Sequence, residues 1–449
     1  MPADPPRPLV VPASHSSGTP VGPDLRALVR LDAVHRDAYL SPAVFRLEMT
    51  RLWARTWIFA GHESQIPAPG DYVTVDLATQ PCILVRHGDG SVRVLRNRCA
   101  HKGAKVVSDA SGNTGAFFRC PYHAWAYDTD GTVRAIPRRQ GYDGTRLHDC
   151  PAGAGLAPAA AVESYRGFVF ARLTGDGPTL SEHLGPMREV IDNMLDRSPS
   201  GEIAVAGGCL RTVVRANWKI YLENINDTMH AVTAHESASS AAERVWARQP
   251  ADRARPLSMQ QLLPFGSGYA FFEQMGGRTL PNGHTLLGTA HSLHSAYAST
   301  PEYVAALEAR HGVEKARAVL AFSPQNAVVY PGLSLKTSPL AMRVLRPLGV
   351  DRTLVEAWSF RAAGAPDELL ARGTLYNRLV FSPQSVVAHD DLHIFETIHE
   401  GLRTRANPWV SLHREHRPDE GTVPEGDVSG TSEALMRHQY RVWLEGMSG

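Results

Sequence analysis

The pattern of apolar and polar positions divides the chain into two parts. From Trp57 to about Leu173, short stretches of alternating apolar and polar residues predominate, separated by turns that contain Gly and Asp. A period of two residues is typical of half-buried strands. It is clearest at residues 72–75, 83–85 and 92–95. This part of the chain is therefore predicted to be an all-β module.

Apolar repeats with helical spacing flank this module. Ser41 and Pro42 predict an N-cap and a first helical residue, and the helix that they begin should extend to about Thr56. After residue 173, helical patterns alternate with strand-like runs such as 354–360. The expected helices cover residues 180–195, 218–234, 302–320 and 367–379, and a last one begins at 431–433. The second part is therefore predicted to be α+β.

Composition narrows the class of protein. The chain has 449 residues, which is more than a single hydrophobic core of ordinary size accommodates. Its 46 basic and 45 acidic residues give a net charge of +1. We therefore expect no nucleic-acid partner and no attraction to anionic membranes. No run of about 18 apolar residues occurs, and the segment 1–25, with scattered Pro, Ser and Gly, lacks the pattern of a signal peptide. A disordered tail at 1–25 and a cytoplasmic location are expected.

Five cysteines are few for this length and irregularly spaced, which argues against a disulfide framework. Two of them are paired with histidines: Cys99 and His101, then Cys120 and His123. Two thiolates and two imidazoles can hold one [2Fe–2S] cluster. A Cys₂His₂ zinc site is the alternative, but both pairs lie in Gly- or Pro-bearing loops, and aromatic residues accompany the second pair at positions 122, 125 and 127.

A second group of candidate metal ligands lies in the segment 217–235. His230 and His235 are five residues apart, with Asp227 one turn before His230 and Glu223 on the same helix face. Because a spacing of five leaves two side chains askew on an unbroken helix, we expect the helix to end or bulge between the histidines. Taken alone, the segment is better explained as a helix surface rich in histidine, because such spacings are common by chance.

Both groups together resemble a known family. Residues 98–103, Arg-Cys-Ala-His-Lys-Gly, and 120–125, Cys-Pro-Tyr-His-Ala-Trp, are similar to the two cluster-binding boxes of Rieske oxygenases, although that family usually has Gly where Ala124 stands. The segment from Asn217 to His235 resembles the iron-binding segment of aromatic oxygenase subunits, the Asn-Trp-Lys lead-in included.

The resemblance implies a role for each candidate residue. Cys99 and Cys120 would bind one iron of the cluster, and His101 and His123 the other. His230 and His235 would bind a mononuclear Fe(II), with a carboxylate completing a facial triad. For that carboxylate we choose Asp391, with Asp390 as the alternative; either could instead cap a helix over 392–402.

Asp227 is assigned a catalytic role by the same resemblance. Its carboxylate would connect His230 to a cluster histidine of a neighbouring subunit, which implies a homotrimer or an assembly of three large and three small subunits. Glu223 would lie near the iron, or would be an ordinary solvated residue.

The implied fold is an all-β Rieske [2Fe–2S] domain over 57–174, inserted near the N-terminus of an α+β catalytic domain. That domain would comprise an N-terminal helical part at 26–56 and residues 175–449, with an antiparallel sheet of the helix-grip type. No nucleotide-binding Gly-x-Gly-x-x-Gly follows a strand. Electrons from NAD(P)H would therefore arrive through a separate reductase, with or without a ferredoxin, and O₂ would be the co-substrate.

The C-terminal segment 430–443 resembles subunits that act on benzoate-like acids, so an aromatic carboxylate is the expected substrate. Its product would be a cis-dihydrodiol or a phenol. Met229 and Phe381 are expected as apolar pocket walls, and an Arg should pair with the carboxylate. The candidates are Arg215, Arg343, Arg346, Arg361 and Arg414.

Three alternatives stay open at this stage. A demethylating Rieske monooxygenase would use the same ligands. A zinc hydrolase could use His230, His235 and an acid. A non-enzymatic electron carrier or structural metal protein would need only the cysteine–histidine module.

Overall fold

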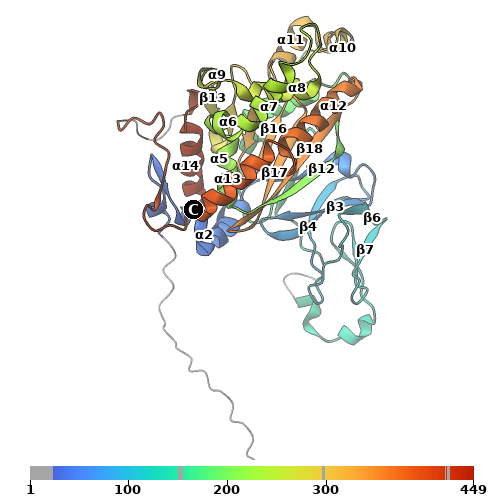
Figure 1. Ribbon diagram of the computed structural model, residues 1–449. Helices are drawn as coiled ribbons and strands as arrows, with labels where there is room; N and C mark the ends of the chain where they lie inside the picture. The colour runs from blue at the N-terminus through green and yellow to red at the C-terminus, as the bar shows by residue number, and fades with distance from the viewer. Residues whose placement is uncertain (1–23, 150–154, 296–298, 420, 422–424, 449) are drawn as a thin grey trace, which may run out of the picture.

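The computed structural model describes residues 24–149, 155–295, 299–419, 421 and 425–448 (Figure 1). Of the predicted tail, residues 1–23 lie outside these ranges, as does Cys150. Leu25, within the predicted tail, is buried next to the short helix η1 (Arg26–Leu28). It is followed by β1 (Ala33–His35) and α1 (Asp37–Leu40).

The predicted cap at Ser41 is confirmed. Its Oγ accepts a hydrogen bond of 3.3 Å from the N–H of Val44, and Pro42 is the first residue of α2 (Pro42–Leu47). The helix continues as a π-helical segment, η2 (Glu48–Trp53), and so ends before the predicted Thr56.

The predicted all-β module is present as small antiparallel sheets, ordered β5-β4-β3-β6, β7-β8-β9 and β10-β11-β2. The predicted strands at residues 72, 83 and 92 are confirmed as β3, β4 and β5. The elements of this module are β2 (Ile58–His62), η3 (Glu63–Gln65), β3 (Asp71–Leu77), β4 (Gln80–Arg86), β5 (Val92–Arg96), β6 (Ser111–Asn113), β7 (Phe117–Arg119), β8 (Ala126–Asp128), β9 (Val133–Ala135), η4 (Arg139–Tyr142), η5 (Arg146–Asp149), β10 (Ala161–Tyr165) and β11 (Phe168–Arg172).

The second part of the chain is built on an eight-stranded antiparallel sheet of order β12-β18-β17-β16-β15-β14-β13-β20. Its strands are β12 (Ile203–Val214), β13 (Gly277–Thr279), β14 (Thr285–Leu287), β15 (Asn326–Val329), β16 (Leu333–Lys336), β17 (Ala341–Gly349), β18 (Arg352–Ala362) and β20 (Gly426–Val428). A separate short strand, β19 (Trp409–Ser411), pairs with β1.

The helices of the second part are α3 (Leu180–Leu184), α4 (Met187–Asp196), α5 (Trp218–Ile225), α6 (Met229–Ala234), α7 (Glu236–Trp246), α8 (Leu257–Leu262), η6 (Leu263–Gly266), α9 (Tyr269–Gln274), η7 (Pro281–Gly283), α10 (Pro301–His311), α11 (Val313–Ala321), α12 (Asp367–Tyr376), η8 (Asn377–Phe381), α13 (Ala388–Gly401) and α14 (Ala434–Ser448). None of the helices in the described ranges has both the length and the apolar character that a membrane span requires.

Several predicted helices are interrupted at identifiable residues. The predicted helix 180–195 is split into α3 and α4 at Gly185, which has φ +48°, and Pro186, which lacks a backbone N–H. Gly312, with φ +79°, separates α10 from α11. Glycine adopts this left-handed conformation without the steric cost that other residues meet, so it ends helices readily.

Both faces of the large sheet are covered. On one face, alternate residues such as Leu335 and Met342 belong to an apolar cluster shared with α4. Because successive side chains of a strand point to opposite faces, Ser334, Lys336 and Arg343 point to the other face. There α5, α12 and α13 pack against the sheet (Figure 1). Polar side chains from β16 and β17 are thereby directed towards these helices.

Glu48 joins α5 to two segments that are distant in sequence. Its fully buried carboxylate accepts hydrogen bonds from Nζ of Lys219, from Nε1 of Trp218 at 3.0 Å and from Nε1 of Trp443 at 2.8 Å. Lys219 itself is 2% exposed. Removing one partner of a buried ion pair leaves the other charge without compensation.

We predict that Glu48→Gln lowers the free energy of unfolding by about 3–5 kcal/mol, because the Lys219 ammonium then stays buried without a counter-charge. Calorimetric unfolding of samples with equal iron content measures the loss. The matched control is Glu314→Gln. Glu314 and its partner Arg317 lie 3.2 Å apart, and their side chains are 87% and 71% exposed. The free energy of unfolding should change by less than about 1 kcal/mol. Equal effects of the two substitutions would contradict this role of Glu48.

Candidate metal centres and substrate cavity

Two loops of the β module carry the cysteine–histidine pairs. In the first loop the N–H of Cys99 donates to the carbonyl oxygen of Ala104, and in the second the N–H of Cys120 donates to that of Trp125, each at 2.8 Å. Each pair therefore lies in a tight loop closed by a backbone hydrogen bond.

The two loops bring their four side chains together. Cys99 and Cys120 are each 2% exposed, and the ring centres of His101 and His123 are 4.6 Å apart. The hydroxyl of Tyr127 lies 3.1 Å from Sγ of Cys99. Burial raises the pKa of Cys99, but hydrogen bonds from Tyr127 and from backbone N–H groups outweigh it and leave the pKa below its usual value. The environment of Cys99 thus favours the thiolate that a metal requires.

These residues fit an iron–sulfur cluster. Nδ1 of His101 is buried and has no hydrogen-bond partner among the described residues, which is costly unless a ligand binds there. The ring of Trp125 stacks parallel to that of His101, 5.0 Å away, and shields this side from water. His123 is exposed, beside the 66% exposed Tyr122. One edge of the candidate cluster site therefore reaches the molecular surface.

Ala124, which departs from the family pattern, has left-handed backbone geometry. Its φ is +57°, and the corresponding residue of the first loop, Gly103, has φ +78°. Both N–H groups donate to the oxygen of the cysteine four residues earlier. A non-glycine residue in this conformation costs roughly 1–2 kcal/mol. The preference of the family for glycine here is therefore conformational, and Ala124 bears the strain without disturbing the loop.

His230 and His235 lie at the two ends of α6. We expected the helix to end or bulge between them, and this is confirmed: α6 ends at Ala234, and His235 has non-helical φ −103° and ψ +16°. The chain also leaves helical geometry before α6, at residues 226–228. The change at His235 lets its imidazole turn towards that of His230.

Three donor atoms from α6 and α13 converge. Nε2 of His230 lies 3.8 Å and Nε2 of His235 3.4 Å from Oδ1 of Asp391, and all three ligand atoms lie within 4.8 Å of one another. Asp391 lies in the first turn of α13, which begins at Ala388, so the alternative interpretation of Asp390 or Asp391 as an N-cap is wrong. Two imidazoles and one carboxylate form the donor set of a facial triad with open positions.

A carboxylate lies behind each imidazole. Oδ2 of Asp227 is 3.2 Å from Nδ1 of His230, and Oδ2 of Asp390 is 3.7 Å from Nδ1 of His235. A carboxylate that is hydrogen-bonded to a histidine orients it so that its other nitrogen can face a metal. Asp227 is within hydrogen-bonding distance of His230, whereas Asp390 makes no hydrogen bond to His235 in this structure. Asp390 therefore lies on the far side of His235 from the point where the three donor atoms converge.

The protonation equilibria differ between the two histidines. Burial, and next the nearby His230, lower the pKa of His235 to about 4. Burial also acts to lower the pKa of His230, but its hydrogen bond to Asp227 and the charges of Asp391 and Asp227 leave that pKa raised. Burial raises the pKa of Asp391. The neutral imidazole that metal ligation needs is thus favoured most strongly at His235.

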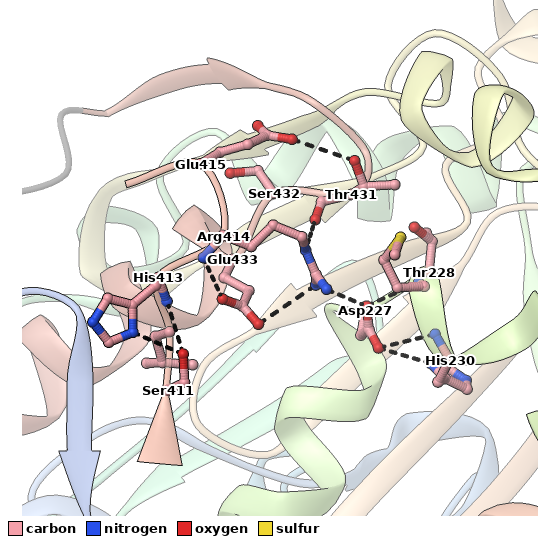
Figure 2. Close-up of polar contacts among 12 residues, drawn as sticks. Asp227, Thr228, His230, Ser411, His413, Arg414, Glu415, Thr431, Ser432 and Glu433 are labelled. Carbon is pink, nitrogen blue, oxygen red and sulfur yellow. Dashed lines mark hydrogen bonds and ion pairs between the residues drawn. The ribbon is translucent and has the colours of Figure 1, made fainter. Parts of the chain in front are cut away.

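Asp227 is held from several sides (Figure 2). Its two oxygens accept hydrogen bonds from the N–H groups of Met229 and His230 at 2.9 and 3.2 Å, which caps the start of α6. Nη2 of Arg414 lies 3.4 Å from Oδ1. Arg414 also donates to the carbonyl oxygen of Thr431 at 2.6 Å and lies 3.6 Å from Glu433. The orientation of Asp227 is therefore fixed by the C-terminal segment as well as by α6.

A cavity opens beside the three converging donor atoms. Its apolar walls come from helices and loops: Ala231, Phe265, Phe272, Met275, Leu293, Tyr376, Val380, Phe381 and Val387. Two buried cations, Lys336 and Arg343, line it from the sheet, together with Asn326 and Gln325. The cavity thus combines aromatic and aliphatic walls with positive charge.

The predicted substrate residues differ in their placement. Phe381 lines the cavity, whereas Met229 is not among its described lining residues. Met229 is the first residue of α6, and only its neighbours Thr228, His230 and Ala231 face the cavity. Glu223 does not line it either; Oε1 of Glu223 accepts hydrogen bonds from Tyr39, at 2.7 Å, and Tyr440.

Two residues of the site were not singled out from the sequence. Nδ2 of Asn224 lies 3.1 Å from Nε2 of His230 and 3.4 Å from Asp391, between two of the converging donors. Asn224 lies one turn before Asp227, and this spacing could have indicated it. Lys336 could have been noticed as a charged residue in the otherwise apolar stretch around β16.

Comparison with known proteins identifies the family. Residues 56–155 match the Rieske [2Fe-2S] domain, and residues 191–449 match the ring hydroxylating alpha subunit (catalytic domain). The chain is 29% identical to the alpha subunit of toluate 1,2-dioxygenase from Pseudomonas putida, over 92% of this chain and 90% of that protein. It is 30% identical to the alpha subunit of N,N-dimethyl phenylurea N-demethylase from Sphingobium sp. (strain YBL2), over 90% of this chain and 88% of that protein.

Solved structures agree on the fold. Naphthalene 1,2-dioxygenase from Rhodococcus sp., bound to indole, superposes with a TM-score of 0.72 at 24% identity, over 92% of this chain and 94% of that one. The predicted combination of a Rieske domain with an α+β catalytic domain is thus confirmed. Its boundaries at residues 56 and 174 stay predictions. The chain belongs to the ring-hydroxylating alpha subunit family, the Rieske non-haem iron oxygenases whose large subunits carry a [2Fe–2S] cluster and a mononuclear iron.

Proposed function

We propose that the chain is a terminal oxygenase component that hydroxylates an aromatic carboxylic acid. The observation that carries this proposal is the position of Arg343, which is 5% exposed and lines the cavity beside the candidate iron ligands. A buried guanidinium is the usual partner of a substrate carboxylate because it can donate two parallel hydrogen bonds. The product would be a cis-dihydrodiol or a phenol.

The other four candidate arginines have different surroundings. None of them is among the described residues that line this cavity, and each has a carboxylate partner of its own. The pairs are Arg215 with Glu396, Arg346 with Glu356, Arg361 with Asp367, and Arg414 with Asp227. Arg343 instead contacts the uncharged Asn326 at 2.7 Å. It is therefore the arginine best able to bind an anion.

The geometry of the two centres supports the proposed ligands. Cys99, Cys120, His101 and His123 would hold the cluster, and His230, His235 and Asp391 the mononuclear iron. When bound, the iron activates O₂ and the cluster supplies electrons singly. Phe381 and its apolar neighbours would exclude water and orient the ring against this centre, while Asp227 would orient the imidazole of His230. Met229 was expected as a substrate residue, but it is not among the described residues that line the cavity, so we assign it no contact with the substrate.

Electrons would come from NAD(P)H through a reductase, with or without a ferredoxin. Figure 1 supports transfer between subunits, because β7, which leads into the second cluster loop, lies at the lower right, apart from α6 in the upper part of the view. A partly exposed Asp227 could then accept a hydrogen bond from a neighbour's exposed His123, within a trimer with or without small subunits.

We predict that the two centres can be removed separately. Dithionite-reduced protein should show a mixed His/Cys cluster signal in electron paramagnetic resonance, with about three irons per chain. Cys99→Ser should lose the cluster signal and retain about one iron per chain. His230→Ala should retain the cluster signal and about two irons per chain. Cys82→Ser, at another buried cysteine of the same domain, is the control and should resemble the parent. Zinc without acid-labile sulfide would overturn the assignment.

For Asp227→Ala we expect both metals to stay bound and NADH-driven turnover to fall by at least about 10- to 100-fold. Hydrogen peroxide carries both oxygen and two electrons, so turnover with peroxide bypasses the cluster. The matched control is Asp390→Ala, which removes the other backing carboxylate. With peroxide, the two variants should turn over at similar rates. With NADH, Asp227→Ala should turn over much more slowly than Asp390→Ala. Retained NADH-coupled turnover in Asp227→Ala would exclude the bridge.

The substrate proposal predicts that Arg343→Gln raises KM for benzoate-type acids by at least about 30-fold, because truncating one partner of a buried charge pair costs 2 kcal/mol or more. Turnover of a neutral aromatic such as toluene should change little. Arg361→Gln, at an exposed arginine, is the control. Steady-state kinetics with product identification measures both effects. Demethylation of a neutral substrate in place of acid hydroxylation would contradict the proposal.

A further inference from the structure

Lys336 is a second cation in the substrate cavity. It is 2% exposed, and among the described residues no carboxylate oxygen lies within 4.0 Å of its Nζ or of the Arg343 guanidinium. Burying an ammonium without a counter-charge costs several kcal/mol. The described residues therefore include two buried basic side chains at the same cavity that have no carboxylate partner.

The contacts of both cations are to uncharged groups. Nζ of Lys336 donates to the carbonyl oxygen of Gln325 and lies 5.4 Å from the ring centre of Tyr376. The guanidinium of Arg343 lies 4.4 Å from the ring centre of Phe381. The two rings contact each other edge to face, with centres 5.4 Å apart. Carbonyl dipoles and ring faces hold the cations in place without cancelling their charge.

The acids of the cavity have other partners. Asp391 is grouped with His230 and His235, where a divalent metal would more than offset its charge. Asp227 is paired with Arg414. An incoming substrate therefore meets an excess of positive charge. Burial, and next the charge of Arg343, lower the pKa of Lys336 well below its usual value, so the charged ammonium is favoured only when an anion lies beside it.

The spacing of the two cations is set by the strand register. Ser334 of β16 is opposite Arg343 of β17, and Lys336 is opposite Ala341. Lys336 and Arg343 are therefore diagonal neighbours on one face of the sheet, roughly 7–8 Å apart at their backbone ends. That distance is on the scale of a single benzene ring with two substituents.

We infer that the substrate is an aromatic dicarboxylate, with Lys336 binding the second carboxylate. This inference rests on the proposed function, in which Arg343 binds the first. Lys336 would then be a specificity-determining residue that distinguishes diacids from benzoate-type monoacids. The aromatic ring would lie between the two cations and the apolar walls that include Phe381.

Isothermal titration calorimetry on the iron-loaded oxygenase tests this inference. The probes are the three benzene dicarboxylates and their monoamides, which have nearly the same shape with one charge fewer. The parent should bind one diacid at least about tenfold more tightly than its monoamide, since one buried charged hydrogen bond is worth about that factor. Lys336→Met should abolish this preference while changing monoamide affinity by less than about threefold.

Lys336→Arg, which keeps the charge, should retain the preference, so the test does not depend on one variant folding. Lys315→Met, at an exposed lysine of α11, is the matched control and should bind like the parent. Equal affinity of the parent for diacids and monoamides, or equal weakening of both by Lys336→Met, would overturn the inference and leave the proposed function intact. Failure of every aromatic acid to bind would overturn the proposed function as well.

Discussion

The buried ion pair between Glu48 and Lys219 is the constraint on which the catalytic domain depends. Lys219 lies in the first turn of α5, and the same carboxylate accepts hydrogen bonds from Trp218 and Trp443. One side chain thereby fixes α5 against η2, near the start of the chain, and against the C-terminal helix α14. Since α5 contains Asn224 and leads directly into Asp227 and α6, the position of both histidines depends on this contact. A buried pair tolerates little displacement, because each charge needs the other.

The parts of the site that the sequence predicts well are local. Cys99 and His101, and likewise Cys120 and His123, are close neighbours within single loops, so their spacing alone restricts where the side chains can lie. The strands of the β module were equally predictable from their alternation and turns. Asp391 is different: it reaches His235 only through tertiary packing of α13, and its identification depended on the family resemblance.

Other features could not be read from periodicity. The helix predicted over 218–234 is interrupted at 226–228, where Asp227 binds the N–H groups at the start of α6, and side-chain capping of this kind is invisible to a count of apolar positions. Met229 follows the same break and is not among the described residues that line the cavity. Lys336 was missed because its burial depends on helices packing over β16, whereas a lysine in a strand is ordinarily solvated.

The cavity divides its tasks between two kinds of structural element. The converging donor atoms belong to α6 and α13, whereas Lys336 and Arg343 belong to neighbouring strands of the sheet. Side chains on a rigid, hydrogen-bonded pair of strands can be exchanged without altering the backbone of helices that contact them from one side. In protein engineering, this separation makes β16 and β17 the place to introduce selectivity for new substrates while the oxidation chemistry is left as it is.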